Sequence, residues 1–244
     1  MVSLNSDMGE SFGIHSFGND DALVSLVDTV NIACGYHAGD PVGIHETVRK
    51  NLEAGVTVGA HPGLPDLVGF GRREMKLFPD EAADIVRYQV GALVAFLKAE
   101  GGQLDHIKTH GSLYGMTSRD SDLAVAVAEV AAEYEVPIFG IPNSEHEKAA
   151  EKVGVPFVAE FYVDLGYTAE GGLIVARRPH ATPVDEARQR AHQALSEGIA
   201  TAVTGEQFPI RVDSVCVHSD TPNAVEIATL VRSVLDELKL SIAK

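Results

Sequence analysis

The feature that most constrains this chain is the alternation of two kinds of apolar segment along its whole length. Short runs rich in β-branched residues, typical of strands, alternate with longer segments whose apolar residues recur every three or four positions, as on one face of a helix. Such alternation predicts a parallel sheet with helices packed outside it. The predicted strands span residues 2–6, 29–33, 56–60, 105–109, 136–141, 157–162 and 214–217.

Capping residues mark the starts of several intervening helices. Asp40 precedes Pro41, and Ile44, Val48 and Leu52 then recur on one face, which predicts a helix beginning at Pro41. Comparable start signals stand at residues 79–81, 182–185 and 221–222.

The length of 244 residues fits one large α/β unit, so we expect residues 1–244 to form a single barrel-like domain. Roughly seven strand–helix units favour a (β/α) barrel, complete or incomplete. An open, doubly wound sheet is the alternative.

Charge and hydropathy exclude several classes of partner. The formal net charge of −16 repels phosphate backbones and anionic lipids, so we expect neither nucleic-acid nor membrane binding. We find no apolar run long enough for a membrane span and no signal-peptide pattern at the start, which makes the cytoplasm the expected location. The two cysteines, Cys34 and Cys216, are expected to be free thiols.

Side-chain alternation along the predicted strands separates two faces. One face is branched and apolar and suits packing against helices; its members are Val2, Leu4, Val56, Val58, Ile107, Val215 and Val217. The opposite face, which would point into the barrel, ends in an ionisable residue on four strands: Asp7, His61, His110 and His218. Catalytic groups of such barrels lie at the carboxyl ends of the strands, so we expect these four side chains to share one site.

Several further side chains are candidates on chemical grounds. Asp7, His37, His61 and His110 are plausible ligands for a divalent metal such as Zn²⁺. Cys34 lies near His37 and is interpreted as a small strand-end residue in preference to a nucleophile. Three further histidines fall on predicted helices and are expected to be solvated: His45, His146 and His192.

Four loop motifs follow one another along the chain: HAGDP (37–41), AHPG (60–63), GFGRR (69–73) and HSDTPNA (218–224). In this order they resemble the motifs of the LamB/YcsF family, the A subunits of bacterial ATP-dependent 5-oxoprolinase. The resemblance runs from Asn5 to Asn223. It implies a distorted seven-stranded (β/α) barrel of the glycoside hydrolase/deacetylase kind, and an ATP-coupled hydrolysis of the 5-oxo-L-proline lactam to L-glutamate with B and C subunits.

The resemblance, joined to the chemistry of amide opening, suggests roles for the clustered residues. Asp7 or Glu10 would act as general base, His61 or His110 as acid or base, and Lys108 would stabilise an oxyanion. Candidate substrate-binding residues are Asn5, His37, Arg72, Arg73, Glu160 and His218. The chain has no G-x-x-x-x-G-K-[ST] loop, so ATP is expected to be bound mainly by the partner subunits.

The chain departs from the family pattern at three positions. Leu165 and Gly172 stand where the family usually has Arg, and Gly115 where it has Asn. Losing an Arg matters for recognising a carboxylate, and Arg177 and Arg178 are candidates to compensate. Two other functions stay open: a stand-alone metal-dependent deacetylase or amidohydrolase, and a non-catalytic lactam-binding subunit.

Overall fold

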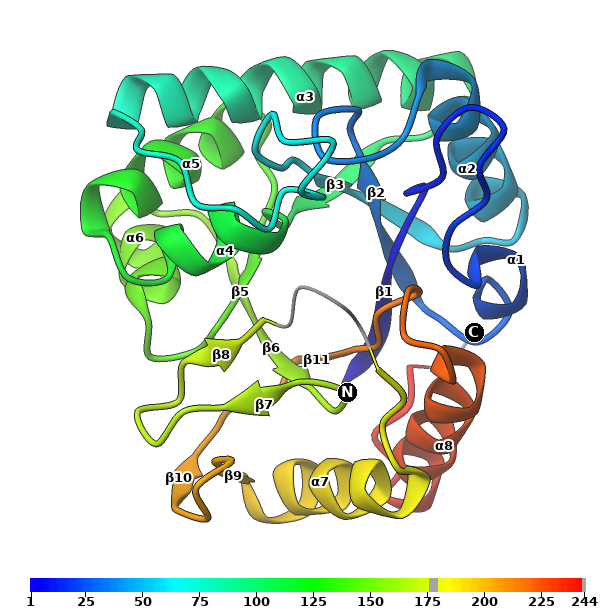
Figure 1. Cartoon of the computed structure of the whole chain (residues 1–244), viewed down its shortest axis with the longest axis vertical. Coiled ribbons are helices and arrows are strands. Elements are labelled where there is room, and N and C mark those ends of the chain that lie inside the picture. The colour runs from blue at the N-terminus through cyan, green and yellow to red at the C-terminus, as the bar shows by residue number, and fades with distance from the viewer. Residues whose placement is uncertain (176–179, 243–244) are drawn as a thin grey trace.

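Seven parallel strands close into a barrel in the computed structural model, which describes residues 1–175 and 180–242 (Figure 1). The order around the barrel is β1, β11, β6, β5, β4, β3 and β2, and β1 pairs with both β11 and β2. These strands are β1 (Ser3–Met8), β2 (Thr29–Ala33), β3 (Thr57–His61), β4 (Leu104–Ile107), β5 (Ile138–Gly140), β6 (Phe157–Tyr162) and β11 (Ser214–Cys216). The seven-stranded barrel prediction is confirmed, and the open sheet was wrong.

Helices surround the barrel and cover its outer face (Figure 1). They are α1 (Asp20–Leu23), α2 (Pro41–Glu53), α3 (Pro79–Ala99), α4 (Gly111–Thr117), α5 (Ser121–Glu133), α6 (Glu145–Val153), α7 (Val184–Glu197) and α8 (Ala224–Glu237). Helix α2 begins at Pro41 as predicted, because the Asp40 side chain accepts the N–H groups of Val42 and Gly43. Helix α8 begins two residues after Pro222, with Asn223 at its N-cap. No helix among the described residues is both long and apolar enough to cross a membrane.

Two antiparallel hairpins interrupt the strand–helix alternation between β6 and β11. Strand β7 (Gly166–Tyr167) pairs with β8 (Leu173–Ile174), and β9 (Ile199–Thr201) pairs with β10 (Gln207–Pro209). Neither hairpin was predicted from the sequence, because strands of two or three residues are too short to show a period of two. The first hairpin follows the barrel strand that carries Glu160 and therefore lies next to the end of the barrel where the candidate site is expected.

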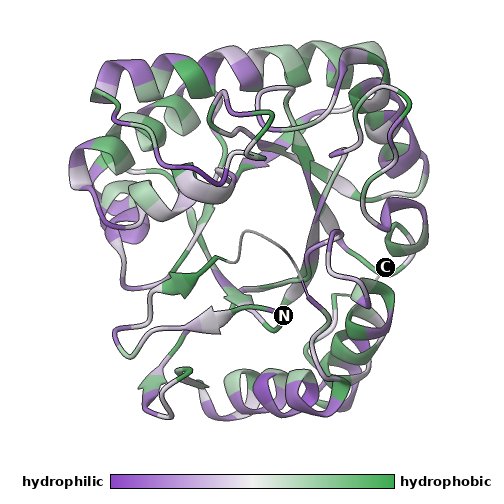
Figure 2. Cartoon of the chain, viewed as in Figure 1, coloured by the Kyte–Doolittle hydropathy of each residue, from purple (hydrophilic) through white to green (hydrophobic). Residues whose placement is uncertain are grey.

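The two faces of the barrel strands differ as the alternation predicted. All seven apolar residues assigned to the helix-facing side are buried. The hydropathy colouring shows that the surrounding helices alternate between polar and apolar residues along their length (Figure 2). The barrel interior is polar: Asn31 donates to Asn5 Oδ1 at 2.9 Å, and His106 Nε2 lies 2.5 Å from Asn31 Oδ1. Gly59 makes room for this histidine, since a Cβ there would lie 2.2 Å from the His106 ring.

Candidate active site at the carboxyl end of the barrel

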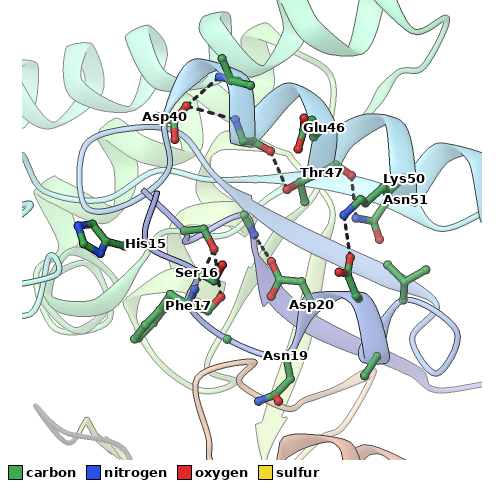
Figure 3. Close-up of a pocket in the computed structure, with 18 of the residues that line it drawn as sticks. His15, Ser16, Phe17, Asn19, Asp20, Asp40, Glu46, Thr47, Lys50 and Asn51 are labelled. Carbon is green, nitrogen blue, oxygen red and sulfur yellow. Dashed lines mark hydrogen bonds and ion pairs between the residues drawn. The ribbon is translucent and has the colours of Figure 1, made fainter. Parts of the chain in front are cut away.

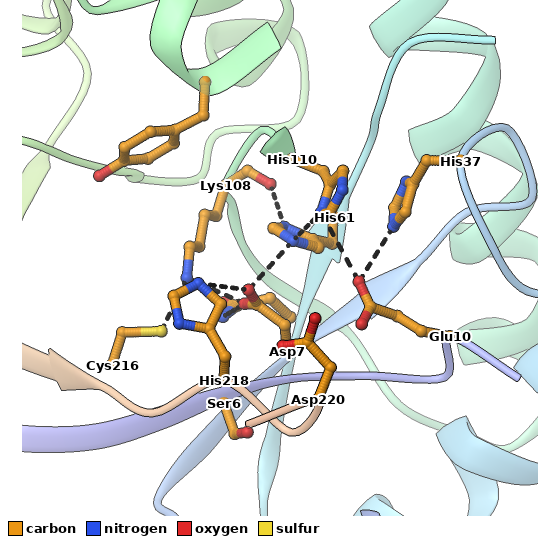
Figure 4. Close-up of polar contacts among 12 residues, drawn as sticks. Ser6, Asp7, Glu10, His37, His61, Lys108, His110, Cys216, His218 and Asp220 are labelled. Carbon is orange, nitrogen blue, oxygen red and sulfur yellow. Dashed lines mark hydrogen bonds and ion pairs between the residues drawn. The ribbon is translucent and has the colours of Figure 1, made fainter. Parts of the chain in front are cut away.

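The carboxylate of Asp7, near the end of β1, is the centre of the buried polar cluster in Figure 4. Its Oδ1 accepts hydrogen bonds from Asn31 Nδ2 at 2.7 Å and Lys108 Nζ at 2.9 Å, and its Oδ2 lies 3.3 Å from His61 Nε2. Burial by itself raises the pKa of Asp7, but the interactions of its carboxylate with His61 and with the Lys108 ammonium outweigh burial and hold this pKa well below its ordinary value. Asp7 is therefore ionised at neutral pH.

Lys108 follows β4, and its ammonium group joins two carboxylates inside the barrel. Its Nζ lies 3.1 Å from Glu160 Oε1 and 3.1 Å from Cys216 Sγ, in addition to its contact with Asp7. Burial lowers the pKa of Lys108, but the neighbouring Asp7 and Glu160 outweigh this effect and raise it well above its ordinary value. The second oxygen of Glu160 accepts from the hydroxyls of Tyr114 and Tyr162, at 3.2 and 2.9 Å.

Three histidines and Glu10 form a second part of the cluster, on the β2–β3–β4 side. His61 Nε2 lies 3.0 Å from His110 Nδ1, and His37 Nε2 lies 3.2 Å from Glu10 Oε1. Burial lowers the pKa of both His37 and His110 well below the ordinary value, and burial raises that of Glu10. His110 lies beyond the end of β4, but the chain keeps its strand-like contacts, because Lys108 N donates to Ala60 O and His110 N to Pro62 O.

His218, two residues after the end of β11, approaches Asp7 from the opposite side. Its Nε2 lies 3.6 Å from Asp7 Oδ2, and its Nδ1 lies 3.1 Å from Asp164. Burial lowers the pKa of His218, but the Asp164 carboxylate outweighs it and raises the pKa to about 9. Asp164 is held in turn by the backbone N–H of His218 and the Thr221 hydroxyl. His218 is therefore an imidazolium at neutral pH.

Arg72 and Arg73 diverge, although both were predicted as substrate-binding residues. The guanidinium of Arg72 is largely buried, donates to Asp220 Oδ2 at 2.9 Å and leaves its Nε without a partner among the described residues. Arg73 instead binds Asp66, and its side chain is half exposed. The structure therefore brings only Arg72 to the cluster.

The structure gathers most of the site candidates but not all of them. The four strand-end residues Asp7, His61, His110 and His218 converge on one cluster, as predicted. Asn5 lies below the cluster, fully buried and hydrogen-bonded to Ser214. Residues of the cluster that were not selected from the sequence are Asn31, Tyr114, Tyr162, Cys216 and Asp220.

Two other expectations from the sequence concern single side chains. His146 is not solvated: it is buried, and its Nε2 lies 2.7 Å from the Thr117 hydroxyl. Cys34 is buried too, and burial raises its pKa to about 12, which agrees with a packing role. Arg177 and Arg178, named as candidates to replace a missing arginine, lie outside the described residues.

The cavity directly over the cluster is small. Its volume is about 30 Å³, room for no more than a few water molecules, and Leu165, Leu173 and Val175 line it opposite Asp7 and Arg72. A larger hollow of about 590 Å³ lies between the loop after β1 and helix α2, lined by Asp20, Glu46, Lys50 and others (Figure 3). None of the clustered histidines lines that hollow.

The donor atoms of part of the cluster are close enough together to bind a metal ion. Among the described residues, donor atoms of Glu10, His37, His61 and His110 lie within 4.8 Å of one another, and so do those of Asp7, Cys216 and His218. The sequence analysis grouped Asp7 with His37, His61 and His110 as candidate metal ligands. In the structure, Glu10 takes the place of Asp7 in this group.

Fold and site together define a (β/α)-barrel protein with a buried cluster of histidines, carboxylates and a lysine at the carboxyl ends of its strands. The family model described as LamB/YcsF family matches residues 2–244. The chain belongs to the LamB/YcsF family.

Named relatives and solved structures agree with this membership. The chain is 42% identical to the A subunit of 5-oxoprolinase of Brevibacillus brevis, over 99% of this chain and 97% of that protein. It is 44% identical to the lactam utilization protein of Emericella nidulans, over 96% and 94%. The crystal structure of a lactam utilization protein from Thermus thermophilus matches with a TM-score of 0.89 and 42% identity, covering 98% of this chain and 97% of that one.

Proposed function

We propose that this chain is the A component of an ATP-dependent 5-oxoprolinase, which cleaves the lactam amide of 5-oxo-L-proline to give L-glutamate. The observation that carries the proposal is the buried cluster in which Asp7 contacts both Lys108 and His61, with Arg72 on the wall of the same cavity. Its support from relatives is the 42–44% identity to proteins named as the A subunit of 5-oxoprolinase, over nearly their whole length.

Opening a lactam requires a polarised carbonyl, a water that loses a proton and a ring nitrogen that gains one. Asp7 has a depressed pKa, so it is a weak base; we assign it the task of holding His61 and Lys108 in place. His61 Nε2 contacts both Asp7 Oδ2 and His110 Nδ1, so this one nitrogen is placed to accept or release a proton beside them. In the metal-free cluster Glu10, whose pKa burial raises, takes up a proton more readily than an ordinary carboxyl group, and we assign it the exchange of a proton with the attacking water.

The cationic groups on the other wall suit the substrate's charge and its leaving nitrogen. His218 carries a proton at neutral pH and lines the cavity, so it can donate to the ring nitrogen as the C–N bond breaks. Arg72 donates one N–H to Asp220, and the remaining N–H groups of its guanidinium are available to bind the substrate carboxylate. Lys108, held by Asp7 and Glu160, contributes a fixed positive charge near the carbonyl.

The ATP-dependent part of the reaction is assigned to the partners. The sequence has no recognisable phosphate-binding loop. We therefore place ATP binding and activation of the lactam mainly on B and C subunits. We assign hydrolysis of the activated lactam to this chain.

A second candidate function has one observation in its favour. The His–Glu group with metal-binding spacing would also suit a stand-alone metal-dependent amidohydrolase or deacetylase. That enzyme would hydrolyse a lactam or acetamide without ATP and without partners. A purely lactam-binding subunit would instead bind 5-oxoproline over the same cluster, with Leu165, Leu173 and Val175 displaced from the small cavity that they line, and perform no chemistry.

Reconstitution separates these functions. Cognate B and C subunits are assayed for ATP-dependent glutamate formation from 5-oxoproline, with and without this chain. The proposal predicts glutamate only when all subunits and ATP are present, and little activity from this chain alone. ATP-independent hydrolysis by the isolated chain would support the amidohydrolase instead.

A further inference from the structure

Two backbone carbonyls fix how the rings of His61 and His110 carry their protons. His61 Nδ1 lies 2.8 Å from Lys108 O, and His110 Nε2 lies 2.8 Å from Phe70 O. A carbonyl oxygen only accepts, so each of these ring nitrogens carries a hydrogen. In the neutral rings, the lone pairs therefore reside on His61 Nε2 and His110 Nδ1.

These two lone-pair atoms face each other inside the cluster. They lie 3.0 Å apart, and the two rings are nearly perpendicular, at 87°. Two lone pairs at this distance repel each other unless a proton or a metal ion lies between them. Ring nitrogens oriented by carbonyls through their second N–H are the usual arrangement of metal-binding histidines.

The carboxylate of Glu10 completes the group from a third direction. Glu10 Oε1 lies 3.6 Å from His110 Nδ1, and its side chain is only 5% exposed. A tetrahedral ion with bonds of about 2.0–2.1 Å has ligand atoms about 3.3 Å apart. The distances from His110 Nδ1 to His61 Nε2, 3.0 Å, and to Glu10 Oε1, 3.6 Å, lie just below and just above that value.

His37 belongs to the group in a different role. Its ring is stacked on that of His110, with centroids 3.6 Å apart and planes 3° apart. Lone pairs lie in the ring plane, so two parallel rings at this spacing cannot both point at one ion. His37 Nε2, 3.2 Å from Glu10 Oε1, is instead placed to donate to that carboxylate (Figure 4).

We propose that His61 Nε2, His110 Nδ1 and the Glu10 carboxylate bind one divalent transition-metal ion of the zinc class, with His37 as a hydrogen-bond donor that orients Glu10. Two imidazoles and one carboxylate leave a fourth position for water or a substrate oxygen, as in open zinc sites. Such an ion would polarise a carbonyl or acidify a bound water.

The charges around Glu10 favour a cation beside it. The side chain of Glu10 is only 5% exposed, and its ion-pair contacts among the described residues are with His37 and His110 alone. The nearby ammonium of Lys108 is already paired with Asp7 and Glu160. A divalent ion would compensate the negative charge of this buried carboxylate.

The proposed metal binding does not depend on 5-oxoprolinase activity, so we test it by measuring metal binding and not catalysis. The full chain is prepared without a histidine tag, stripped with a chelator and titrated with ZnCl₂ against a competing indicator. Variants Glu10→Gln, His110→Asn and His37→Asn are compared with His45→Asn, whose ring is half exposed and pairs with Glu100 outside the cluster.

The wild type and His45→Asn should each bind one equivalent of Zn²⁺ with the same affinity. Glu10→Gln and His110→Asn should weaken binding by at least ~100-fold, and His37→Asn by about 10-fold, as for an orienting residue. Wild-type binding no tighter than that of Glu10→Gln would overturn the site.

A spectroscopic measurement on the zinc-loaded wild type keeps the inference testable if His110→Asn does not fold. X-ray absorption should show two imidazole ligands and oxygen ligands at about 2.0–2.2 Å. Three imidazoles, or only oxygen ligands, would overturn this ligand assignment.

Discussion

The Nζ atom of Lys108 lies 2.9 Å from Oδ1 of Asp7, where neither side chain is more than 5% exposed. The same ammonium group contacts Glu160 Oε1 at 3.1 Å. Replacing Lys108 with Met removes the cation and leaves two buried carboxylates facing each other. We expect this variant to lower the free energy of unfolding by about 3–5 kcal/mol, measured by urea denaturation.

The matched control is Lys50→Met. Lys50 makes an ion pair of similar length with Asp21, at 2.8 Å, but its side chain is 51% exposed and that of Asp21 82%. The loss of stability in this control should be below about 1 kcal/mol. Equal effects of the two substitutions would contradict the buried ionic centre.

The Asp164–His218 pair predicts a titration that can be measured directly. Nuclear magnetic resonance of ¹⁵N-labelled histidine should find His218 half protonated near pH 9, because the Asp164 carboxylate raises its pKa from the ordinary value of 6.5 to about 9. Asp164→Asn should lower this midpoint by at least about one pH unit, whereas Asp21→Asn should leave it unchanged. A His218 midpoint that does not respond to Asp164→Asn would contradict the assigned pairing.

The same shift has a consequence for stability. His218 binds its proton more tightly in the folded than in the unfolded chain, so its contribution to stability is fully present below about pH 6.5. That contribution is lost as the pH rises through about 9. Urea denaturation at about pH 6 and about pH 9.5 should show a larger loss of stability in the wild type than in Asp164→Asn.

Arg72 and Arg73 offer a test of carboxylate recognition within one dipeptide. Arg72→Lys keeps a positive charge but loses the planar fork that binds a carboxylate through two hydrogen bonds. We expect the affinity for 5-oxoproline, measured by isothermal titration calorimetry, to fall about 10-fold. Arg73→Lys should leave it unchanged, because Arg73 is bound to Asp66 outside the cavity; the reverse ranking would reject the assignment.

Leu165 lines the same cavity as Asp7 and Arg72, at the position where the sequence resemblance leads us to expect an arginine. If the substrate is a lactam carboxylate, Leu165→Arg should raise its affinity about 10-fold by adding a second guanidinium. Leu165→Met is the control, since it keeps an apolar side chain of similar volume. Weaker binding by Leu165→Arg, with the fold intact, would argue that the natural ligand of this chain is uncharged at that position.

The sequence was sufficient to place the residues that lie on barrel strands. Side-chain alternation is rigid along a strand, so Asp7 and His61 could be assigned to the inner face, and the strand-like contacts after β4 extended the rule to His110. Loops follow no such rule. Arg72 and Arg73 are chemically alike and follow a turn in which Phe70 and Gly71 both have positive φ, yet Arg72 binds Asp220 at the cluster and Arg73 binds Asp66.

Other parts of the site depend on partners far apart in the chain. Asp220 belongs to the site because it accepts a hydrogen bond from Arg72, which lies 148 positions away in the sequence. No local sequence pattern predicts a pair at this separation. Glu10 and His37 were both selected from the sequence. The stacking of the His37 ring on the His110 ring, however, is visible only in the folded structure. Tyr162 could have been found, because it shares a strand face with Glu160.

The most direct test of the account concerns Asp7 in the assembled enzyme. The Asp7→Asn chain, of nearly unchanged shape, is combined with the B and C subunits, and both co-purification and ATP-dependent glutamate formation are measured. Since Asp7 is buried inside the barrel, the variant should assemble as the wild type does. Glutamate formation should fall at least ~100-fold, because His61 and Lys108 lose the charged partner that holds them in place. An assembled complex with Asp7→Asn that forms glutamate at nearly the wild-type rate would contradict the claim that this cluster is the site of lactam opening.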